Sequence, residues 1–289
     1  MRGDRMPSIK TLIATAGEVL RASGVPTARQ DAGLLLAYVL GTDRTFIISH
    51  PEELVSDRVG ANFENAIKRR SAGEPVQYIT GKQEFYKLEF EVTPDVLIPR
   101  PETEVLVEHA LALLPHTEST SRICDLGTGS GCILISLLHE RPKAKGVGID
   151  ISERAIRVAR RNASKHAVLT RLDLVVSDCL DAIAPMPIFD LVLSNPPYVS
   201  ADLIGGLQRE VRDYEPRVAL SPGGDGLSII HKLLAHAAPF LKREGHLLIE
   251  IGFDQHEKVV RRVDKKMWKL LDVYKDLQGI PRTVVLEKR

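Results

Sequence analysis

The chain has 289 residues, of which 44% are hydrophobic and 27% are charged. This length favours one large domain plus a smaller one, and the composition is typical of a globular protein. Its 39 Lys and Arg residues nearly balance 38 Asp and Glu residues, a net charge of +1. The overall charge therefore gives no reason to expect nucleic acid or an anionic membrane as a partner.

The cysteines and the apolar runs indicate the compartment. Cys124, Cys132 and Cys179 show no C-x-x-C spacing, which favours reduced core residues over a disulfide or a metal site. No apolar run approaches the roughly 20 residues of a membrane span, and residues 1–10 lack the apolar region of a secretory signal. We therefore expect a cytoplasmic protein.

Residues 1–82 are predicted to form a small helical bundle. Apolar residues recur at helical spacing from Ile9 to Leu20, and a second helix follows a cap at Thr27 and ends at Gly41. A further helix includes Phe63 and Ile67. This part carries 11 Lys and Arg residues against 9 Asp and Glu residues. That excess is too small for a DNA-binding module, so we interpret the bundle as a protein-contact or positioning domain.

Residues 83–94 are predicted to be a β-hairpin linker, and residues 95–289 are predicted to be the second domain. Near the start of that domain, prolines hold an extended segment and acidic residues favour a helix that continues to Leu114. From Arg122 onward, strand and helix patterns alternate as in a doubly wound α/β sheet. The predicted strands are Arg122–Leu126, Lys145–Asp150, Leu172–Val176, Phe189–Ser194 and His246–Ile251, and the predicted helices are Gly131–Glu140, Ile151–Lys165 and Leu227–Leu241.

Two late strands, Trp268–Tyr274 and Thr283–Leu286, are predicted to pair with each other. Their connection is too short for a parallel crossover, so we expect an antiparallel pair.

A glycine-rich turn, Asp125–Gly131, lies where the first strand of this sheet leads into its helix. Glycines there allow a tight turn and a close approach of the backbone to a ligand. A dinucleotide fingerprint would need glycine where the chain has Cys132, so NAD is disfavoured. Because ligands of such sheets bind at the carboxyl ends of the strands, we expect a nucleoside cofactor here. Its predicted ligands are Gly127, Thr128, Gly129, Ser130 and Gly131 in the turn, Asp150 for the ribose hydroxyls, Asp178 and Cys179 near the adenine, and Asn195.

The tetrapeptide Asn195-Pro196-Pro197-Tyr198 follows the fourth strand. Two prolines stiffen this loop, because each fixes its own φ and restricts the residue before it. The Asn195 oxygen and the Pro196 carbonyl can then act as paired acceptors beside the Tyr198 ring. Such a site would hold a planar group that bears an NH2. The alternative is an ordinary turn with Tyr198 as a packing residue.

Taken together, the glycine-rich turn, Asp150 and the tetrapeptide resemble a class I S-adenosylmethionine-dependent methyltransferase that modifies a planar NH2 nitrogen. The tetrapeptide also occurs in DNA adenine and cytosine amino-methyltransferases, so it does not identify the substrate. Longer segments are similar to the HemK/PrmC family, whose members methylate the glutamine of the Gly-Gly-Gln motif in class I peptide release factors. These segments are residues 74–81, 97–104, 214–220 and 275–282.

The resemblance implies an α/β fold of the class I methyltransferases: a Rossmann-like, seven-stranded, mostly parallel sheet with an antiparallel last strand, plus an N-terminal helical bundle that recognises the release factor. It implies S-adenosylmethionine as cofactor. It also implies that Asn195 and Pro196 hold the substrate amide while Pro197 and Tyr198 pack on its plane. We expect a monomer with release factors as partners and without sequence-specific nucleic acid binding. Cys179 stands where relatives often have an aromatic residue.

Three alternatives remain at this point. A sister group methylates a glutamine of a ribosomal protein, but residues 101–104 favour the release-factor branch. A DNA amino-methyltransferase would need a basic recognition region, which the charge count does not supply. A non-catalytic adaptor would not need both a cofactor carboxylate and the tetrapeptide.

Overall fold

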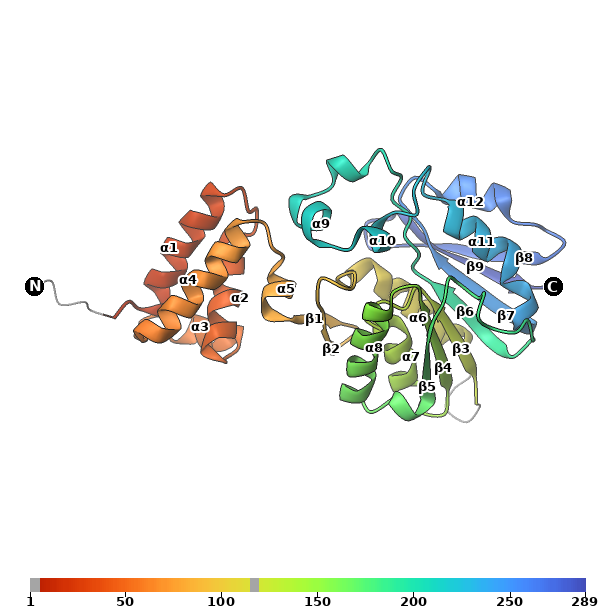
Figure 1. Ribbon diagram of the computed structural model, residues 1–289, viewed down its shortest axis with the longest axis horizontal. Coiled ribbons are helices and arrows are strands. Elements are labelled where there is room, and N and C mark those ends of the chain that lie inside the picture. The colour runs from red at the N-terminus through yellow and green to blue at the C-terminus, as the bar shows by residue number, and fades with distance from the viewer. Residues whose placement is uncertain (1–5, 115–119) are drawn as a thin grey trace, which may run out of the picture. The chain divides into compact units, whose positions relative to one another are not determined.

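The computed structural model describes residues 6–114 and 120–289, which form two compact units (Figure 1). The first unit comprises the chain up to Gly81 together with Gln208–Tyr214. The second comprises Lys82–Leu207 and Glu215–Arg289. Within the described ranges, none of the helices combines the length and the apolar character needed to cross a bilayer.

The first unit is a helical bundle with a single apolar core. Its helices are α1 (Ile9–Ala22), α2 (Ala28–Leu40), α3 (Arg44–Ser49), α4 (Asp57–Ser71) and α5 (Val76–Thr80). Leu20, Leu36 and Phe63 from three of these helices are almost completely buried in one cluster. Thr27 occupies the N-cap position of α2 but makes no side-chain cap bond, contrary to the expectation. Its ψ of 25° is far from the extended conformation that directs an N-cap side chain at the first turn.

Helix α9 (Arg209–Tyr214) belongs to this unit although it follows the fourth strand of the sheet in the chain. The guanidinium of Arg70, which is buried, forms ion pairs of 2.7 Å with Asp31 and with Glu210 of α9. The Tyr214 hydroxyl donates a hydrogen bond of 3.1 Å to the carbonyl of Ala72. These long-range contacts hold α9 on the bundle, and no local sequence pattern indicated them.

The second unit begins with an antiparallel hairpin of β1 (Lys82–Phe85) and β2 (Leu88–Glu91). A 3-10 turn, η1 (Pro101–Thr103), then leads into α6 (Glu104–Leu113). The Glu104 carboxylate accepts a hydrogen bond of 2.9 Å from the backbone N–H of Tyr86 in the hairpin turn. The hairpin is thereby fastened to the start of α6.

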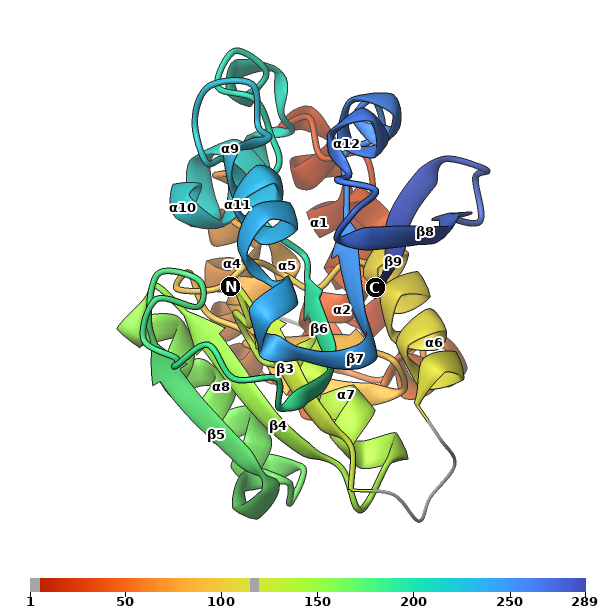
Figure 2. The same ribbon diagram turned by 90° about the vertical axis from the view of Figure 1, so that its right-hand side faces the viewer.

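A seven-stranded sheet forms the centre of the second unit, with the order β5-β4-β3-β6-β7-β9-β8 (Figure 2). Neighbouring strands are parallel from β5 to β7, whereas β9 runs antiparallel to both β7 and β8. The predicted fold class and the pairing of the two last strands are confirmed. The strands are β3 (Arg122–Leu126), β4 (Lys145–Asp150), β5 (Leu172–Val176), β6 (Phe189–Ser194), β7 (Leu241–Glu250), β8 (Trp268–Lys275) and β9 (Pro281–Lys288).

Helices cover both faces of this sheet, because alternate strand residues enter two different cores. Ile123 of β3 packs in the cluster that contains residues of α6 and of α7 (Cys132–Glu140), whereas Cys124 packs in the cluster that contains residues of α11 (Ser228–His236) and α12 (His256–Arg262). The covering helices are α7, α8 (Glu153–Lys165), α11 and α12, and shorter turns are η2 (Leu169–Arg171), η3 (Ile204–Gly206), α10 (Arg217–Leu220) and η4 (Ala238–Phe240). Strand β3 lies between β4 and β6, so the strand order reverses there. Ligands of such sheets bind at this switch point.

The helix expected over Leu227–Leu241 is shorter than predicted. Helix α11 ends at His236, the 3-10 turn η4 follows, and β7 already begins at Leu241. Pro239 lies in that turn, where its missing N–H and its ring cannot be accommodated within an α-helix. The expected strand at His246 therefore begins earlier.

Candidate cofactor and active site

A cavity of about 360 Å³ lies at the carboxyl ends of β3, β4 and β6 in the second unit. Ten of the twelve predicted site residues line it; Gly131 and Tyr198 do not. Side chains from four segments thus meet at one place, as the rule for strand ends predicts. The predicted lining residues are Gly127, Thr128, Gly129, Ser130, Asp150, Asp178, Cys179, Asn195, Pro196 and Pro197.

The glycine-rich turn after β3 needs its glycines for conformation. Gly127, Gly129 and Gly131 have φ values of 75°, 54° and 80°, a region that glycine adopts without strain. A Cβ on Gly131 would also lie 2.7 Å from the Ile135 side chain. Gly131 therefore shapes the turn into α7 instead of lining the cavity.

Asp150 at the end of β4 is held by two backbone donors. Its Oδ2 accepts a hydrogen bond of 2.9 Å from Gly129 N–H, and its Oδ1 accepts one of 2.9 Å from Ser152 N–H. Burial raises the pKa of Asp150, and the hydrogen bonds from Ser152 and Gly129 oppose that rise. Each carboxyl oxygen retains acceptor capacity, so Asp150 can receive two hydroxyl groups of a ribose.

Asp125 lies on β3, at the start of the glycine-rich turn, and is fully buried. Its Oδ2 accepts a hydrogen bond of 2.8 Å from the Thr128 hydroxyl, and Oδ1 has no hydrogen-bond partner among the described residues. Burial raises the pKa of Asp125 to about 7, while the Thr128 bond acts in the opposite direction. Asp125 thus holds Thr128, a residue of the cavity wall, in place.

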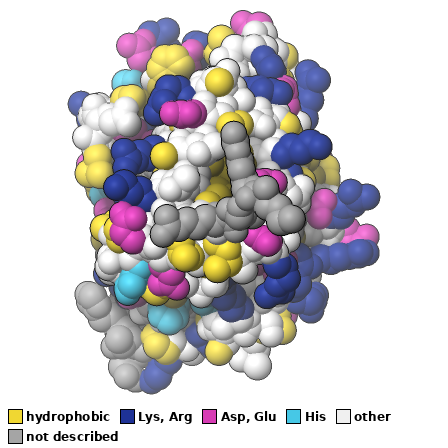
Figure 3. Space-filling view, turned by 90° about the vertical axis from the view of Figure 1, so that its left-hand side faces the viewer, with side chains coloured by type: hydrophobic (Ala, Val, Ile, Leu, Met, Phe, Trp, Pro, Cys, Tyr) yellow, Lys and Arg dark blue, Asp and Glu magenta, His cyan; other side chains and the backbone are white. Residues whose placement is uncertain are grey.

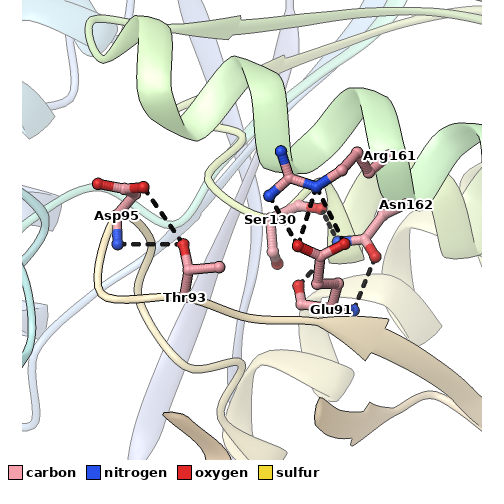
Figure 4. Close-up of polar contacts among 6 residues, drawn as sticks. All are labelled: Glu91, Thr93, Asp95, Ser130, Arg161 and Asn162. Carbon is pink, nitrogen blue, oxygen red and sulfur yellow. Dashed lines mark hydrogen bonds and ion pairs between the residues drawn. The ribbon is translucent and has the colours of Figure 1, made fainter. Parts of the chain in front are cut away.

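Asn162 of α8 holds the glycine-rich turn through Ser130, a role that was not predicted from the sequence (Figure 4). Its amide nitrogen donates to the carbonyl oxygens of Ser130 and Glu91 over 2.9 and 3.0 Å, and its oxygen accepts from Glu91 N–H over 2.7 Å. Asn162 is fully buried, so these bonds satisfy a polar group that would otherwise be costly to bury. The sequence signal for this role was an asparagine on the apolar face of an amphipathic helix.

The loop after β5 contributes Asp178 and Cys179 to the cavity wall. Asp178 forms an ion pair of 3.1 Å with Lys232, and that hydrogen bond lowers the pKa of its carboxyl. Cys179 has a φ of 49°, and burial raises the pKa of its thiol to about 11. The thiol is therefore neutral at pH 7 and offers the cavity a small, polarizable contact.

Asn195 follows β6 and presents one side of its amide to Thr103. Its Nδ2 donates a hydrogen bond of 3.0 Å to Oγ1 of Thr103, which is 2% exposed. This bond uses one hydrogen of Nδ2, and the amide oxygen, which accepts no hydrogen bond from the described residues, is available to a ligand in the cavity. Thr103 was not among the predicted site residues.

Tyr198 does not line the cavity but anchors the loop that does. Its hydroxyl donates a hydrogen bond of 3.3 Å to Glu250 Oε1, and its backbone carbonyl accepts one of 2.9 Å from Gln255 Nε2. Burial raises the pKa of Tyr198, so the phenol stays protonated. Neither Glu250 nor Gln255 was predicted from the sequence.

The sheet order, the glycine-rich turn, the carboxylate at the end of β4 and the amide at the end of β6 define a class I methyltransferase. Members of this class use S-adenosylmethionine.

Comparisons with known proteins agree with this class. Residues 11–81 match the PrmC N-terminal domain, and residues 102–205 match the methyltransferase small domain. A release factor glutamine methyltransferase of Koribacter versatilis is 41% identical over 97% of this chain and 99% of its own. A second, from Cereibacter sphaeroides, is 42% identical over 92% of this chain and 93% of its own.

A solved methyltransferase structure from Pyrococcus furiosus shares the fold, with a TM-score of 0.52, 16% identity, and coverage of 79% of this chain and 98% of that one. The sequence relatives are much more similar. The chain belongs to the release factor glutamine methyltransferase family.

Gly226→Ala is expected to lower the rate of methyl transfer about 100-fold, because small displacements of reacting groups have effects of that size. Gly226 has a φ of 80°, and a Cβ there would lie 2.2 Å from the Tyr198 carbonyl oxygen. The added methyl group must therefore displace the Asn195–Tyr198 loop. The measurement is the initial rate at saturating cofactor.

Gly223→Ala is the matched control. Gly223 has a φ of 83°, but a Cβ there meets no atom within 4 Å. Gly223→Ala introduces the same backbone strain without displacing the loop. Equal losses of the methyl-transfer rate in both variants would therefore contradict the steric explanation.

Proposed function

We propose that this protein transfers a methyl group from S-adenosylmethionine to the side-chain amide nitrogen of the glutamine in the Gly-Gly-Gln motif of class I peptide release factors. The observation that carries the proposal is the oriented amide of Asn195 beside a cavity bounded by the glycine-rich turn and Asp150. The two relatives are named release factor glutamine methyltransferases, which supports a release factor as the substrate.

The residues of the cavity fit S-adenosylmethionine. Glycines with positive φ permit a close approach to the glycine-rich turn, and the doubly held carboxylate of Asp150 suits a ribose. Cys179 and Asp178 would lie near the adenine, as in the sequence-based proposal. When bound, the cofactor supplies an electrophilic methyl group on a sulfonium: the new N–C bond would form as the S–C bond breaks, S-adenosylhomocysteine would leave as the neutral thioether, and the amide nitrogen would release one proton to solvent.

An amide nitrogen is a weak nucleophile, because its lone pair is delocalised into the carbonyl. Positioning therefore contributes more than acid-base chemistry. In the proposed mechanism the Asn195 oxygen and the Pro196 carbonyl each accept one N–H of the glutamine amide, while Pro197 borders its plane. Tyr198, predicted to pack on the same plane, instead anchors the loop through Glu250. Two fixed acceptors favour the partly positive nitrogen of the transition state over the neutral ground state. Holding the amide in line with the methyl group supplies much of the remaining rate.

The near balance of 39 Lys and Arg residues against 38 Asp and Glu residues favours a protein substrate over DNA. On the face shown in Figure 3, outside the grey residues, Lys and Arg side chains are mixed with Asp and Glu side chains. A DNA amino-methyltransferase would need a coherent basic area for the phosphates.

The test is incubation of the protein with cofactor labelled in its methyl group and a class I release factor, followed by mass spectrometry of the digested product. We expect one added methyl group on the glutamine of the Gly-Gly-Gln motif. A release factor in which that glutamine is replaced is the control and should remain unlabelled. Preferential labelling of a large-subunit ribosomal protein or of DNA in parallel reactions would contradict the proposal.

A further inference from the structure

Gln255 lies in the turn between β7 and α12 and is 3% exposed, and the proposed mechanism gives it no role. Its side-chain amide makes two hydrogen bonds to the backbone. Nε2 donates one of 2.9 Å to the carbonyl oxygen of Tyr198, and Oε1 accepts one of 2.9 Å from Gly252 N–H. A reversed amide would set oxygen against oxygen and N–H against N–H, so these two bonds fix its orientation.

The backbone of the same turn holds Gln255 in place. Its N–H donates a hydrogen bond of 3.1 Å to the Gly252 carbonyl, and its carbonyl accepts one of 2.9 Å from Val259 N–H in α12. A Cβ on Gly252 would lie 3.1 Å from Oε1 of Gln255, so the glycine leaves the amide the room to fold back. The donor Nε2 is therefore presented from a fixed base.

This turn meets the Asn195–Tyr198 loop because the two segments follow neighbouring strands at one edge of the sheet. Strands β6 and β7 are parallel, and Ser194 lies opposite Ile249. The chain that leaves β6 and the chain that leaves β7 thus emerge side by side. The hydrogen bond from Gln255 to Tyr198 joins them across 57 positions of the sequence.

The carbonyl that Gln255 holds lies two residues after the Pro196 carbonyl, which lines the cavity as a proposed substrate acceptor. Each proline fixes its own φ, and Pro197 keeps Pro196 extended. Few backbone rotations remain between the two carbonyl groups, so fixing the second restricts the direction of the first. Since neither proline has an N–H, the loop has no backbone donor at these positions that could hold it instead.

We propose that Gln255 is a positioning residue that, by holding the Tyr198 carbonyl, keeps the Pro196 carbonyl aimed at an N–H of the substrate amide. The inference rests on the proposed function, because it assigns a cause to the direction of one of the two acceptors for the glutamine amide. Gln255 itself does not line the cavity and touches neither reactant.

Gln255→Met keeps an unbranched side chain of similar length and removes both hydrogen bonds. We expect kcat on the release factor to fall about 10-fold, the factor that corresponds to one hydrogen bond, because the Pro196 carbonyl is no longer held in one direction. Cofactor affinity, measured by calorimetry, should change less than about 2-fold, since Asp150 and Gly129 are bonded to each other and not to Gln255.

Trp268→Phe is the matched control for stability. Trp268 is 1% exposed, does not line the cavity, and donates a hydrogen bond of 2.8 Å from Nε1 to the Leu234 carbonyl. Like Gln255→Met, this substitution leaves a buried backbone carbonyl without its side-chain donor, so both variants should have a lower Tm. Assayed well below both Tm values, Trp268→Phe should retain a normal kcat, whereas Gln255→Met should not.

The double variant Gly226→Ala/Gln255→Met tests whether the effect passes through the Tyr198 carbonyl. A Cβ on Gly226 would lie 2.2 Å from that carbonyl oxygen and 3.1 Å from Gln255 Nε2, so Gly226→Ala disturbs the same hydrogen bond. Because both substitutions act on one contact, kcat of the double variant should lie within about 2-fold of that of Gly226→Ala.

A kcat for Gln255→Met within about 2-fold of the unchanged protein, an equal loss in Trp268→Phe, or losses that multiply in the double variant would overturn the inference. Those results leave the proposed function intact, since the unchanged protein still methylates the release factor. Failure of the unchanged protein to methylate the release factor while it binds cofactor would overturn the proposed function, and the inference with it.

Discussion

Asn195→Ala should lower kcat for methyl transfer to the release factor by about 100- to 1,000-fold, the range found when one acceptor or donor that stabilises a transition state is removed. Alanine supplies no oxygen for the substrate N–H, and it also leaves the buried Thr103 hydroxyl without the donor that it has at 3.0 Å. The measurement is single-turnover transfer of a labelled methyl group at saturating cofactor, so that binding and transfer are separated.

Cofactor affinity of the Asn195→Ala variant is the internal control, and we expect it to stay close to that of the unchanged protein. The glycine-rich turn and Asp150 do not depend on the Asn195 side chain for their hydrogen bonds. Turnover near the normal rate would refute the acceptor role of Asn195. A parallel loss of cofactor binding would show that its side chain supports the cavity and not the substrate.

Asp150→Ala should weaken binding of S-adenosylmethionine by about 10- to 100-fold, because hydrogen bonds to a charged group are worth about 1.5–3 kcal/mol. The substitution removes the ribose acceptor and also releases Gly129 N–H, which the carboxylate holds at 2.9 Å. Titration calorimetry of the variant and the unchanged protein gives the two dissociation constants directly.

Asp173→Ala is the matched control, since Asp173 is an exposed aspartate on the neighbouring strand β5 and does not line the cavity. The affinity of the Asp173→Ala variant for the cofactor should remain normal.

Because burial raises the pKa of Asp150, acid should weaken cofactor binding at a higher pH than for an ordinary aspartate. Unchanged affinity of Asp150→Ala would remove Asp150 from the ribose role.

The regular elements of the sheet could be predicted because their signals are local. The apolar runs that end at Leu126, Asp150, Val176 and Ser194 have the predicted bounds in the structure. The prediction was wrong for the end of the helix at His236. Apolar residues continue on both sides of Pro239, so the apolar pattern does not show the change from helix to strand. Periodicity alone cannot separate a buried helix end from the start of a buried strand.

The sequence by itself determined the alternation of the central strands and helices along the chain, the glycine-rich turn and the stiff loop at Asn195, because backbone restriction and apolar spacing act over a few residues. Only the tertiary structure decided which side chains support that loop. Thr103 meets Asn195 across 92 positions of the chain, and Tyr198 meets Glu250 across 52. These contacts depend on how parallel strands and the turn before α6 are brought together, and a hydrogen bond between distant segments leaves no periodic pattern in either one.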